Sequence, residues 1–282
     1  MALLQKAYLG ATPLFRNTAW FEDDAALIVS EAINVTVTAD TAAHTKGAWA
    51  QLIASTSANA SFIFVQVSGI GISNTDTASL IDLATGASGS ETAIASNIAV
   101  GSASTGMGVG VGGSLVAFPY KIPSGTRIAA RLQSVVTGSK TATVNAYAIN
   151  FGDYATAPTS VDVIGGDTAT SKGIEFSGAS GTWVQAVAST SRAYRGVCLV
   201  TSAHNSSLGN TRPLYEIGVG SAGNEVVFGT LNNFTDTSER LGVAAPYSIL
   251  FGRNIPAGSR LAVRHNLAAN PDRYGFNLIG IP

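Results

Sequence analysis

The stretch that decides the fold is GAWAQLIASTS at residues 47–57, because it returns as GTWVQAVASTS at residues 181–191. Its two tryptophans, Trp49 and Trp183, lie 134 residues apart. Two further blocks repeat in the same order along the chain. Ordered blocks at one spacing identify an internal duplication, which has to be recognised before any fold is assigned.

The second block, LIDL at residues 80–83, returns at the same offset as LYEI at residues 214–217. The third block, IPSGTRIAAR at residues 122–131, returns as IPAGSRLAVR at residues 255–264, with the offset reduced to 133. The second copy has therefore one net deletion between these two blocks. The second block also brings a repeated pair of glycines and a glutamate in each copy: Gly86, Gly89 and Glu91, then Gly220, Gly223 and Glu225.

These offsets divide the 282 residues into a first domain at 34–158 and a second domain at 159–282. A linker with Pro158 among small residues joins the two domains. Residues 1–33 have no copy, although they hold aromatic side chains such as Trp20. We expect residues 1–33 to form an N-terminal attachment segment that docks on a neighbouring molecule. Alternatively, they fold back on the first domain as an extra strand.

The repeated blocks favour β-strands, since their apolar residues alternate with period two rather than 3.6. In residues 49–54 this alternation places Trp49, Gln51 and Ile53 on one face. Arginines of the third block share the opposite face from its apolar residues, so that face must be solvated or paired. The inward residues are expected to be Ile128, Ala130 and Leu132, with Leu261 and Val263, and the outward residues Arg127, Ala129, Arg131 and Gln133, with Arg260 and Arg264.

Residues 61–67 and 197–201 are rich in β-branched or aromatic residues and are typical of buried strands. Residues 122–125 and 255–258 place Pro second and Gly fourth, as type I turns prefer. The sequence therefore predicts an all-β protein of two tandem homologous β-sandwich domains, jelly-roll-like, with at most one or two turns of helix.

The composition limits the partners. Charged residues make up 12% of the chain, about half the usual share, and the net charge is −1 with no block of one sign. Binding to a nucleic-acid duplex needs clustered Lys and Arg side chains, so it is not expected. Arg accounts for eight of the nine basic residues in 159–282, which suggests that the second domain meets an anionic or hydrogen-bonding partner.

The N-terminus lacks the apolar core of a signal peptide, and no stretch reaches membrane-spanning length. We therefore expect synthesis in a host cytoplasm, no export by the secretory signal and no membrane insertion. The single cysteine, Cys198, excludes an internal disulfide, and its apolar surroundings predict a buried core residue.

Several motifs resemble functional sites, but none predicts a catalytic, cofactor-binding or metal-binding residue. Residues 218–223 match G-x-G-x-x-G, but a strand follows them instead of a helix, which favours a hairpin turn. A second match at residues 108–113 lies in a glycine-rich stretch that favours a flexible loop. The three histidines lack metal-ligand spacing: His44, His204 and His265.

Asp82 and Glu216 occupy the same repeat position, as do Glu91 and Glu225. A carboxylate present in both copies suits a cation or a sugar hydroxyl, but pairing with the outward arginines is the favoured interpretation. Three tyrosines are likewise expected in the core rather than as platforms for sugars: Tyr194, Tyr215 and Tyr274.

The repeated Gly-x-Trp-x-Gln, Gly-x-x-Gly-x-Glu and Ile-Pro-x-Gly-[Thr/Ser]-Arg motifs resemble a domain of structural proteins from tailed phages and gene transfer agents. The resemblance implies a non-enzymatic virion component of the head spike, fibre or decoration type. It also implies homo-oligomers such as trimers, contact with host surface polysaccharide, and attachment to other virion proteins (capsid, portal or tail, or spike base) through residues 1–33. It identifies no binding residues. The alternatives are a carbohydrate-binding or a polysaccharide-degrading tail component, the latter requiring two nearby carboxylates.

Overall fold

The computed structural model describes residues 27–69, 78–101, 114–176, 179–203, 214–232, 248–267 and 274–282. All regular structure in these ranges is β-strand, which confirms the predicted fold class. Within them, no helix is long and apolar enough to cross a membrane. The strands are β1 (Leu27–Thr38), β2 (Ala50–Ile53), β3 (Ala60–Ser68), β4 (Ser79–Thr85), β5 (Thr92–Val100), β6 (Ser114–Ile122), β7 (Ile128–Ser134), β8 (Thr141–Asn150), β9 (Asp162–Ile164), β10 (Ile174–Glu175), β11 (Trp183–Val187), β12 (Tyr194–Ala203), β13 (Leu214–Val219), β14 (Val226–Asn232), β15 (Ser248–Ile255), β16 (Leu261–His265) and β17 (Tyr274–Ile281).

The first sandwich packs two four-stranded antiparallel sheets against each other. Sheet A has the order β1-β8-β3-β6, and sheet B has the order β2-β7-β4-β5. The pairs β1–β8, β2–β7, β3–β6 and β4–β5 describe one long hairpin wrapped around the core, which is the jelly-roll arrangement. The core between the sheets includes Ile63 and Val65 of β3 and Leu132 of β7.

The second sandwich repeats this arrangement strand for strand. Sheet C has the order β10-β17-β12-β15, with β9 also paired to β17, and sheet D has the order β11-β16-β13-β14. Its core is more aromatic: Phe176 stacks on Tyr215 at 5.2 Å between ring centroids and contacts Phe276 at 4.8 Å. The duplication seen in the sequence is thus a duplication of a complete jelly roll.

The register of the two sheets locates the residue that changes the repeat offset. Leu83 pairs with Ala95 as Ile217 pairs with Gly229, but the next matched pair is Ile81–Ile98 in the first copy and Tyr215–Leu231 in the second. The first copy therefore has two residues, Ser96 and Asn97, where the second has only Thr230. Asn97 adopts a left-handed backbone with φ 61°, as one residue of some β-bulges does. The offset of 133 follows from this extra residue.

A second difference lies in the first strand of each copy. β1 is one continuous strand, with a register shift at Val29 and a bulge at Ile33 and Asn34, between Ala32 and Val35. The matching strand of the second copy is split into β9 and β10, and residues 165–173 leave the sheet between them. This segment, here called the clasp, lies over the first sandwich: the side-chain nitrogen of Gln133 donates to the Thr168 carbonyl.

β1 also corrects a predicted boundary. The first sandwich begins at Leu27, so residues 27–33 belong to its edge strand rather than to a separate segment. This part of the chain follows the alternative of an added strand. Residues 1–26, with their aromatic side chains, lie outside the described residues.

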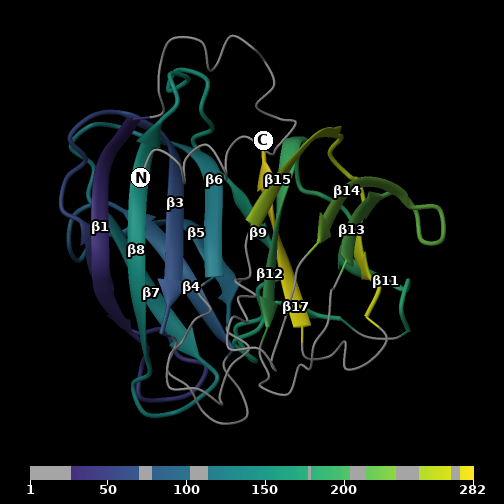
Figure 1. Cartoon of the computed structure of the whole chain (residues 1–282), viewed down its shortest axis with the longest axis horizontal. Helices are drawn as coiled ribbons and strands as arrows, with labels where there is room; N and C mark the ends of the chain where they lie inside the picture. The colour runs from purple at the N-terminus through teal and green to yellow at the C-terminus, as the bar shows by residue number, and fades with distance from the viewer. Residues whose placement is uncertain are drawn as a thin grey trace.

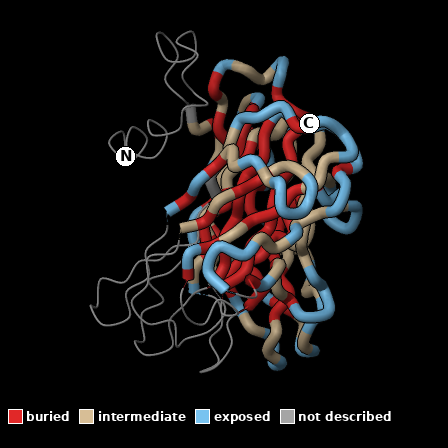
Figure 2. The backbone as a smooth tube through the Cα atoms, turned by 90° about the vertical axis from the view of Figure 1, so that its right-hand side faces the viewer, coloured by how far each residue is buried: buried red, intermediate tan, exposed pale blue. Residues whose placement is uncertain are grey.

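Sheet C stands in the middle of the molecule, between the first sandwich and sheet D (Figure 1). One face of sheet C packs in its own sandwich through residues such as Val197 and Leu199. Its other face joins the core of the first sandwich through Cys198, Val200, Ile279 and Ile281. Buried residues consequently run through the whole body, while the exposed ones gather in the connecting turns (Figure 2).

Two local predictions need correction. The predicted face shared by Trp49, Gln51 and Ile53 is broken by a register shift between Gln51 and Ile53, which turns Ile53 into the core. The turn after Ile122 lies one residue later than expected: the Thr126 amide donates to the Pro123 carbonyl, and Gly125 holds φ 80°. Since that φ requires glycine at the third position, the turn is not type I.

A buried threonine ties each of these turns to the neighbouring loop. Thr56 donates from its hydroxyl to the Pro123 carbonyl, and this hydroxyl accepts the Thr126 amide. Thr190 makes the same two bonds, to the Pro256 carbonyl and from the Ser259 amide. These contacts explain why the threonine of the Ser-Thr-Ser sequence occurs in both copies.

Candidate functional site

The outer faces of sheets B and D each carry a Trp–Arg–carboxylate row. In the first copy the Arg131 guanidinium lies over the Trp49 ring, 4.4 Å from its centroid, and donates to Asp82 Oδ2 at 2.8 Å. In the second copy the guanidinium of Arg264 lies 4.7 Å from the Trp183 ring centroid and donates to Glu216 Oε2 at 2.5 Å. The repeated tryptophans thus hold the arginines in place on the outer face.

A second repeated ion pair lies at the turn end of the same sheets. Arg127 donates to Glu91 at 2.9 Å and to the Gln51 side chain, and its counterpart Arg260 donates to Glu225 at 2.6 Å and to Gln185. Desolvation raises the pKa of both glutamates, but hydrogen bonds from backbone amides and these arginines outweigh it. The net result is a lowered pKa for Glu91 and for Glu225.

These ion pairs include all four carboxylates that the sequence analysis singled out. Each of the four is bonded to an arginine of its own copy, so the favoured interpretation of structural pairing is confirmed. A glycosidase dyad needs one carboxyl group free to be protonated and another free to act as base or nucleophile. The pairings named from the sequence therefore supply no such dyad.

The two rows differ in how far they are covered. The Asp82 side chain is 1% exposed and receives a second cation, Lys46, at 2.6 Å. The Lys46 ammonium also donates to Asn97 Oδ1, and burial lowers the pKa of this lysine despite its bond to Asp82. The corresponding Glu216 side chain is 25% exposed. The carboxylate of the first row is therefore covered and that of the second is partly exposed, while Arg131 and Arg264 are similarly exposed.

The arginines of the second domain were expected to meet an external partner. All five that the structure describes have partners within the chain. Arg192, Arg260 and Arg264 pair with carboxylates, Arg195 donates to the Pro282 carbonyl, and Arg253 lies over the Phe228 ring. Their number reflects internal structure, while Arg212, Arg240 and Arg273 lie outside the described residues.

The remaining candidate residues fall in the core or at the junction. Cys198 is fully buried, as predicted, and burial raises the pKa of its thiol. His265 is buried against Phe176, and burial lowers its pKa. His44 bonds Ser171 of the clasp at 2.9 Å. The three tyrosines expected in the core are all buried: Tyr194, Tyr215 and Tyr274.

The glycine motif at residues 218–223 forms the turn between β13 and β14, which confirms the predicted hairpin. The match at residues 108–113 and His204 lie outside the described residues. Among the residues that the structure describes, no group of three or more His, Cys, Asp or Glu side chains is placed to hold a metal ion.

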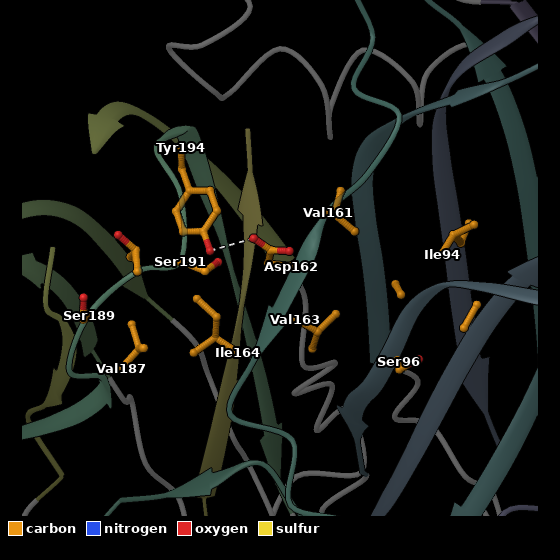
Figure 3. A pocket seen from close by; sticks show the side chains of 13 residues that line it. Ile94, Ser96, Val161, Asp162, Val163, Ile164, Val187, Ser189, Ser191 and Tyr194 are labelled. Carbon is orange, nitrogen blue, oxygen red and sulfur yellow. Dashed lines mark hydrogen bonds between the residues drawn. The ribbon is translucent and has the colours of Figure 1, made fainter. Parts of the chain in front are cut away.

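A cleft of about 440 Å³ lies between the two sandwiches. β5 forms one wall, β9 and the residue before it form the floor, and the loop after β11 forms the other wall (Figure 3). Apolar side chains of the floor are flanked by small hydroxyl side chains. The labelled lining residues are Ile94, Ser96, Val161, Asp162, Val163, Ile164, Val187, Ser189, Ser191 and Tyr194.

Asp162 is the charged group of this cleft. Its Oδ2 accepts from Arg192 Nε and from the Tyr194 hydroxyl, both at 2.8 Å, and its Oδ1 accepts from the second guanidinium nitrogen of Arg192. Desolvation raises the pKa of Asp162, but the bonds from Arg192 and Tyr194 outweigh it, so the carboxylate stays ionised well into acid. Burial and the bond to Asp162 raise the pKa of Tyr194 to about 12.

This arrangement is suited to binding rather than to proton transfer. Both oxygens of Asp162 are occupied by donors, and the tyrosine holds its proton throughout the physiological range. A small neutral ligand with hydroxyl groups matches the serine-lined walls and the apolar floor. No sequence pattern indicates this cleft, because its residues come from separate blocks that neither copy repeats as a set.

The comparisons with known proteins give a fold likeness only. No protein-family model matches the chain, and no curated protein matches it. Its structure is similar to the STIV MCP, a viral major capsid protein, with 10% identity and a TM-score of 0.33 over 89% of this chain and 96% of the other. It is also similar to N-glycanase F (PNGase F), with 9% identity and a TM-score of 0.41 over 92% and 96%. Neither likeness is close enough to carry function.

Proposed function

We propose that this chain is a non-enzymatic structural protein of a phage-like particle, displayed on the particle as a spike, fibre or decoration component. The observation that carries the proposal is that the charged side chains of the repeated sites are paired within the chain. Each repeated carboxylate is paired with an arginine of its own copy, and the described arginines of the second domain all have partners within the chain. A fold rich in internal pairs and poor in free reactive groups suits a building block.

The low charge and the phage-like motifs support the same setting. A surface of small neutral side chains packs against neighbouring subunits with little desolvation cost, since few charges have to be buried. In this proposal the residues that precede β1 attach the chain to a capsid, portal, tail or spike-base protein.

The test is a comparison of particles with and without the gene for this chain. Electron microscopy of the deletion particles should show a surface feature missing from the head or tail, and re-expression of the chain should restore it. Identical surfaces in the two preparations would exclude the proposal.

The cleft beside Asp162 favours a second role, contact with host surface polysaccharide. The test is adsorption of the whole chain to purified capsular polysaccharide. Ala93 is exposed and lines the cleft, so Ala93→Trp should fill it and abolish adsorption. Ala87 is exposed in a turn and does not line the cleft, so Ala87→Trp is the matched control. Equal adsorption by both variants would remove the cleft from consideration.

A further inference from the structure

An amine, a carboxylate and a carboxamide meet on the outer side of sheet B. The Lys46 ammonium donates to Asp82 Oδ1 at 2.6 Å and to Asn97 Oδ1 at 2.7 Å. The Asn97 backbone amide donates to the same Asp82 oxygen at 2.7 Å. The three residues come from different segments, since Lys46 precedes β2, Asp82 lies in β4 and Asn97 lies in β5. The fold therefore brings a lysine amine against an asparagine side chain, with a carboxylate beside both.

The second copy has neither the amine nor the carboxamide at the matching positions. At the repeat offset Lys46 corresponds to Ser180, and the bulge that holds Asn97 has only Thr230 in its place. The arginine–carboxylate pair of the row forms in both copies, so it needs neither side chain. The lysine and the asparagine are therefore additions to the first copy, and both are placed against the same carboxylate.

The second sandwich covers this group of side chains. The Asp82 side chain is 1% exposed. The clasp packs directly on Asn97, since a Cβ on Gly166 would lie 2.3 Å from the Asn97 Cβ. Sheet C covers β5 two residues further along, where the side-chain oxygen of Asn277 accepts the Ala99 amide at 2.6 Å. The carboxylate and the carboxamide are thus held in fixed positions with little access to water.

Lys46 has the properties of a nucleophile in this position. Desolvation lowers its pKa more than the bond to Asp82 raises it, which enlarges the neutral fraction of the amine that can attack a carbonyl carbon. The carbon of the Asn97 carboxamide, Cγ, is one C=O bond of about 1.2 Å from Oδ1, so the lysine Nζ lies within about 4 Å of it. Reacting atoms in a near-attack arrangement are about 3–3.5 Å apart, so a small movement of the Lys46 side chain is enough.

We propose that Lys46 and Asn97 join in an isopeptide bond within the chain, with Asp82 as the proton acceptor. The ammonium first gives a proton to Asp82 Oδ1, while Arg131 occupies the other carboxylate oxygen. The lone pair of Nζ then forms a bond to Asn97 Cγ, and a second Nζ proton passes to Nδ2 of the asparagine. The Cγ–Nδ2 bond breaks with its electron pair on the nitrogen. Ammonia leaves, takes up the proton held by Asp82 and departs as ammonium, so no oxidant or other reactant is consumed.

The bond spans sheet B, because β2 and β5 are the two edge strands of that sheet. It links the segment before β2 covalently to β5, as a disulfide would in a chain with more than one cysteine. A covalent link of this kind restricts the unfolded chain and stabilises the fold. The proposed crosslink therefore strengthens the first sandwich on the side where the second sandwich covers it.

The experiment measures the intact mass of the full chain by high-resolution mass spectrometry, in samples taken over time after purification. The wild-type chain should reach a mass lower than that of its sequence by one ammonia, and a protease digest should contain a branched peptide that joins Lys46 to Asn97. Lys46→Arg keeps a cation beside Asp82 without a nucleophilic amine, and Asn97→Gly accepts the positive φ without a carboxamide. Both variants should keep the full sequence mass. Lys140→Arg is the matched control and should lose ammonia as the wild type does.

The wild-type result decides the proposal even if a variant fails to fold. A folded wild-type chain that keeps its full mass after prolonged incubation overturns it. A loss of ammonia that persists in Lys46→Arg also overturns it, because an asparagine can lose ammonia by cyclising on its own backbone without a lysine. Asp82→Asn retains the size of the side chain but is a far weaker proton acceptor, so it should slow the reaction by about 100-fold. Crosslinking of Asp82→Asn at the wild-type rate would overturn the role given to this carboxylate.

Discussion

One threonine in each copy, Thr56 or Thr190, is hydrogen-bonded to the turn that precedes β7 or β16. Each is almost fully buried, and its hydroxyl both donates and accepts a hydrogen bond. Replacing such a group by an isosteric apolar one leaves a buried amide and a buried carbonyl without partners, which costs more than the bonds themselves stabilise.

We therefore predict that Thr56→Val and Thr190→Val each lower the free energy of unfolding by about 1–3 kcal/mol. Thr56→Ser and Thr190→Ser keep the hydroxyl and should cost less than the valine variants. Urea denaturation measures the difference. A valine variant as stable as its serine control would contradict the role given to these hydroxyls.

His265 controls how the stability of the fold responds to acid. Burial lowers the pKa of His265 below its ordinary value of about 6.5. Just below that pH, the imidazole is protonated in the unfolded chain but still neutral in the folded chain. Stability then falls as the pH drops through the unfolded value of about 6.5. The paired carboxylates act in a lower pH window. The lowered pKa of Glu91, Glu225 and Asp162 contributes stability that is lost only as the pH falls through and below the ordinary carboxyl range.

The variant His265→Asn tests this assignment. An asparagine oxygen can accept the Leu267 amide as the ring nitrogen Nδ1 does, while the titrating group is removed. We expect a lower stability at pH 7.5, through lost contact with Phe176, and a shallower fall between pH 6.5 and 5 in urea denaturation. An unchanged slope in that interval would assign the acid response to another group.

Among the elements, the β5 bulge and the clasp distinguish the two copies. The backbone of the clasp passes so close to Asn97 that a Cβ on Gly166 would lie 2.3 Å from the Asn97 Cβ. The extra residue of the first copy therefore supports the extra segment of the second. Sequence comparison showed that one residue was gained or lost, and only the strand register showed which one and what it contacts.

Gly166→Ala should consequently displace the clasp, at a cost of about 1–3 kcal/mol in the free energy of unfolding. Hydrogen exchange should accelerate at Asp167 and Lys172, whose backbones pair with each other. Gly181→Ala is the control, since open space surrounds it and only its positive φ is strained. Equal exchange rates in wild type and Gly166→Ala would mean that the clasp is not held by this contact.

The sequence predicted those elements whose residues make their contacts within one copy of the repeat. The alternation in the third block placed Leu132 inward and Arg131 outward, and the repeat of both carboxylates with both arginine rows predicted their pairing. The junction was not predictable in this way. The run around Cys198 indicates a strand buried on both faces, but it does not say that the second face belongs to another sandwich.

At the scale of the whole molecule, the shared core makes Cys198 a reporter of the junction. Its thiol lies between sheet C and β6 and is the chain's only cysteine. We predict that a thiol reagent labels Cys198 at the rate of global unfolding, since the sandwiches cannot separate without exposing the core. Labelling that is fast under native conditions, and unaffected by a stabilising salt, would show that the sandwiches part without unfolding.

The same core predicts how the second sandwich behaves alone. A fragment of residues 159–282 would expose the sheet C face of Val200, Ile279 and Ile281 to water. We expect it to aggregate or to bind a hydrophobic dye, whereas the full chain unfolds in one transition by calorimetry. A monomeric fragment that binds no dye would contradict the shared core.

The turn between β13 and β14 has a further consequence, for protein engineering. Ser221, Ala222 and Gly223 are exposed at the end of the molecule away from the first sandwich (Figure 1). The matching turn of the first copy stays exposed at Ala87 and Ser88 even though the neighbouring β5 is covered. A foreign peptide spliced into the second turn would thus be presented outward whether or not the neighbouring strand β14 is covered. The turn is therefore a place at which this fold can accept and present a foreign peptide.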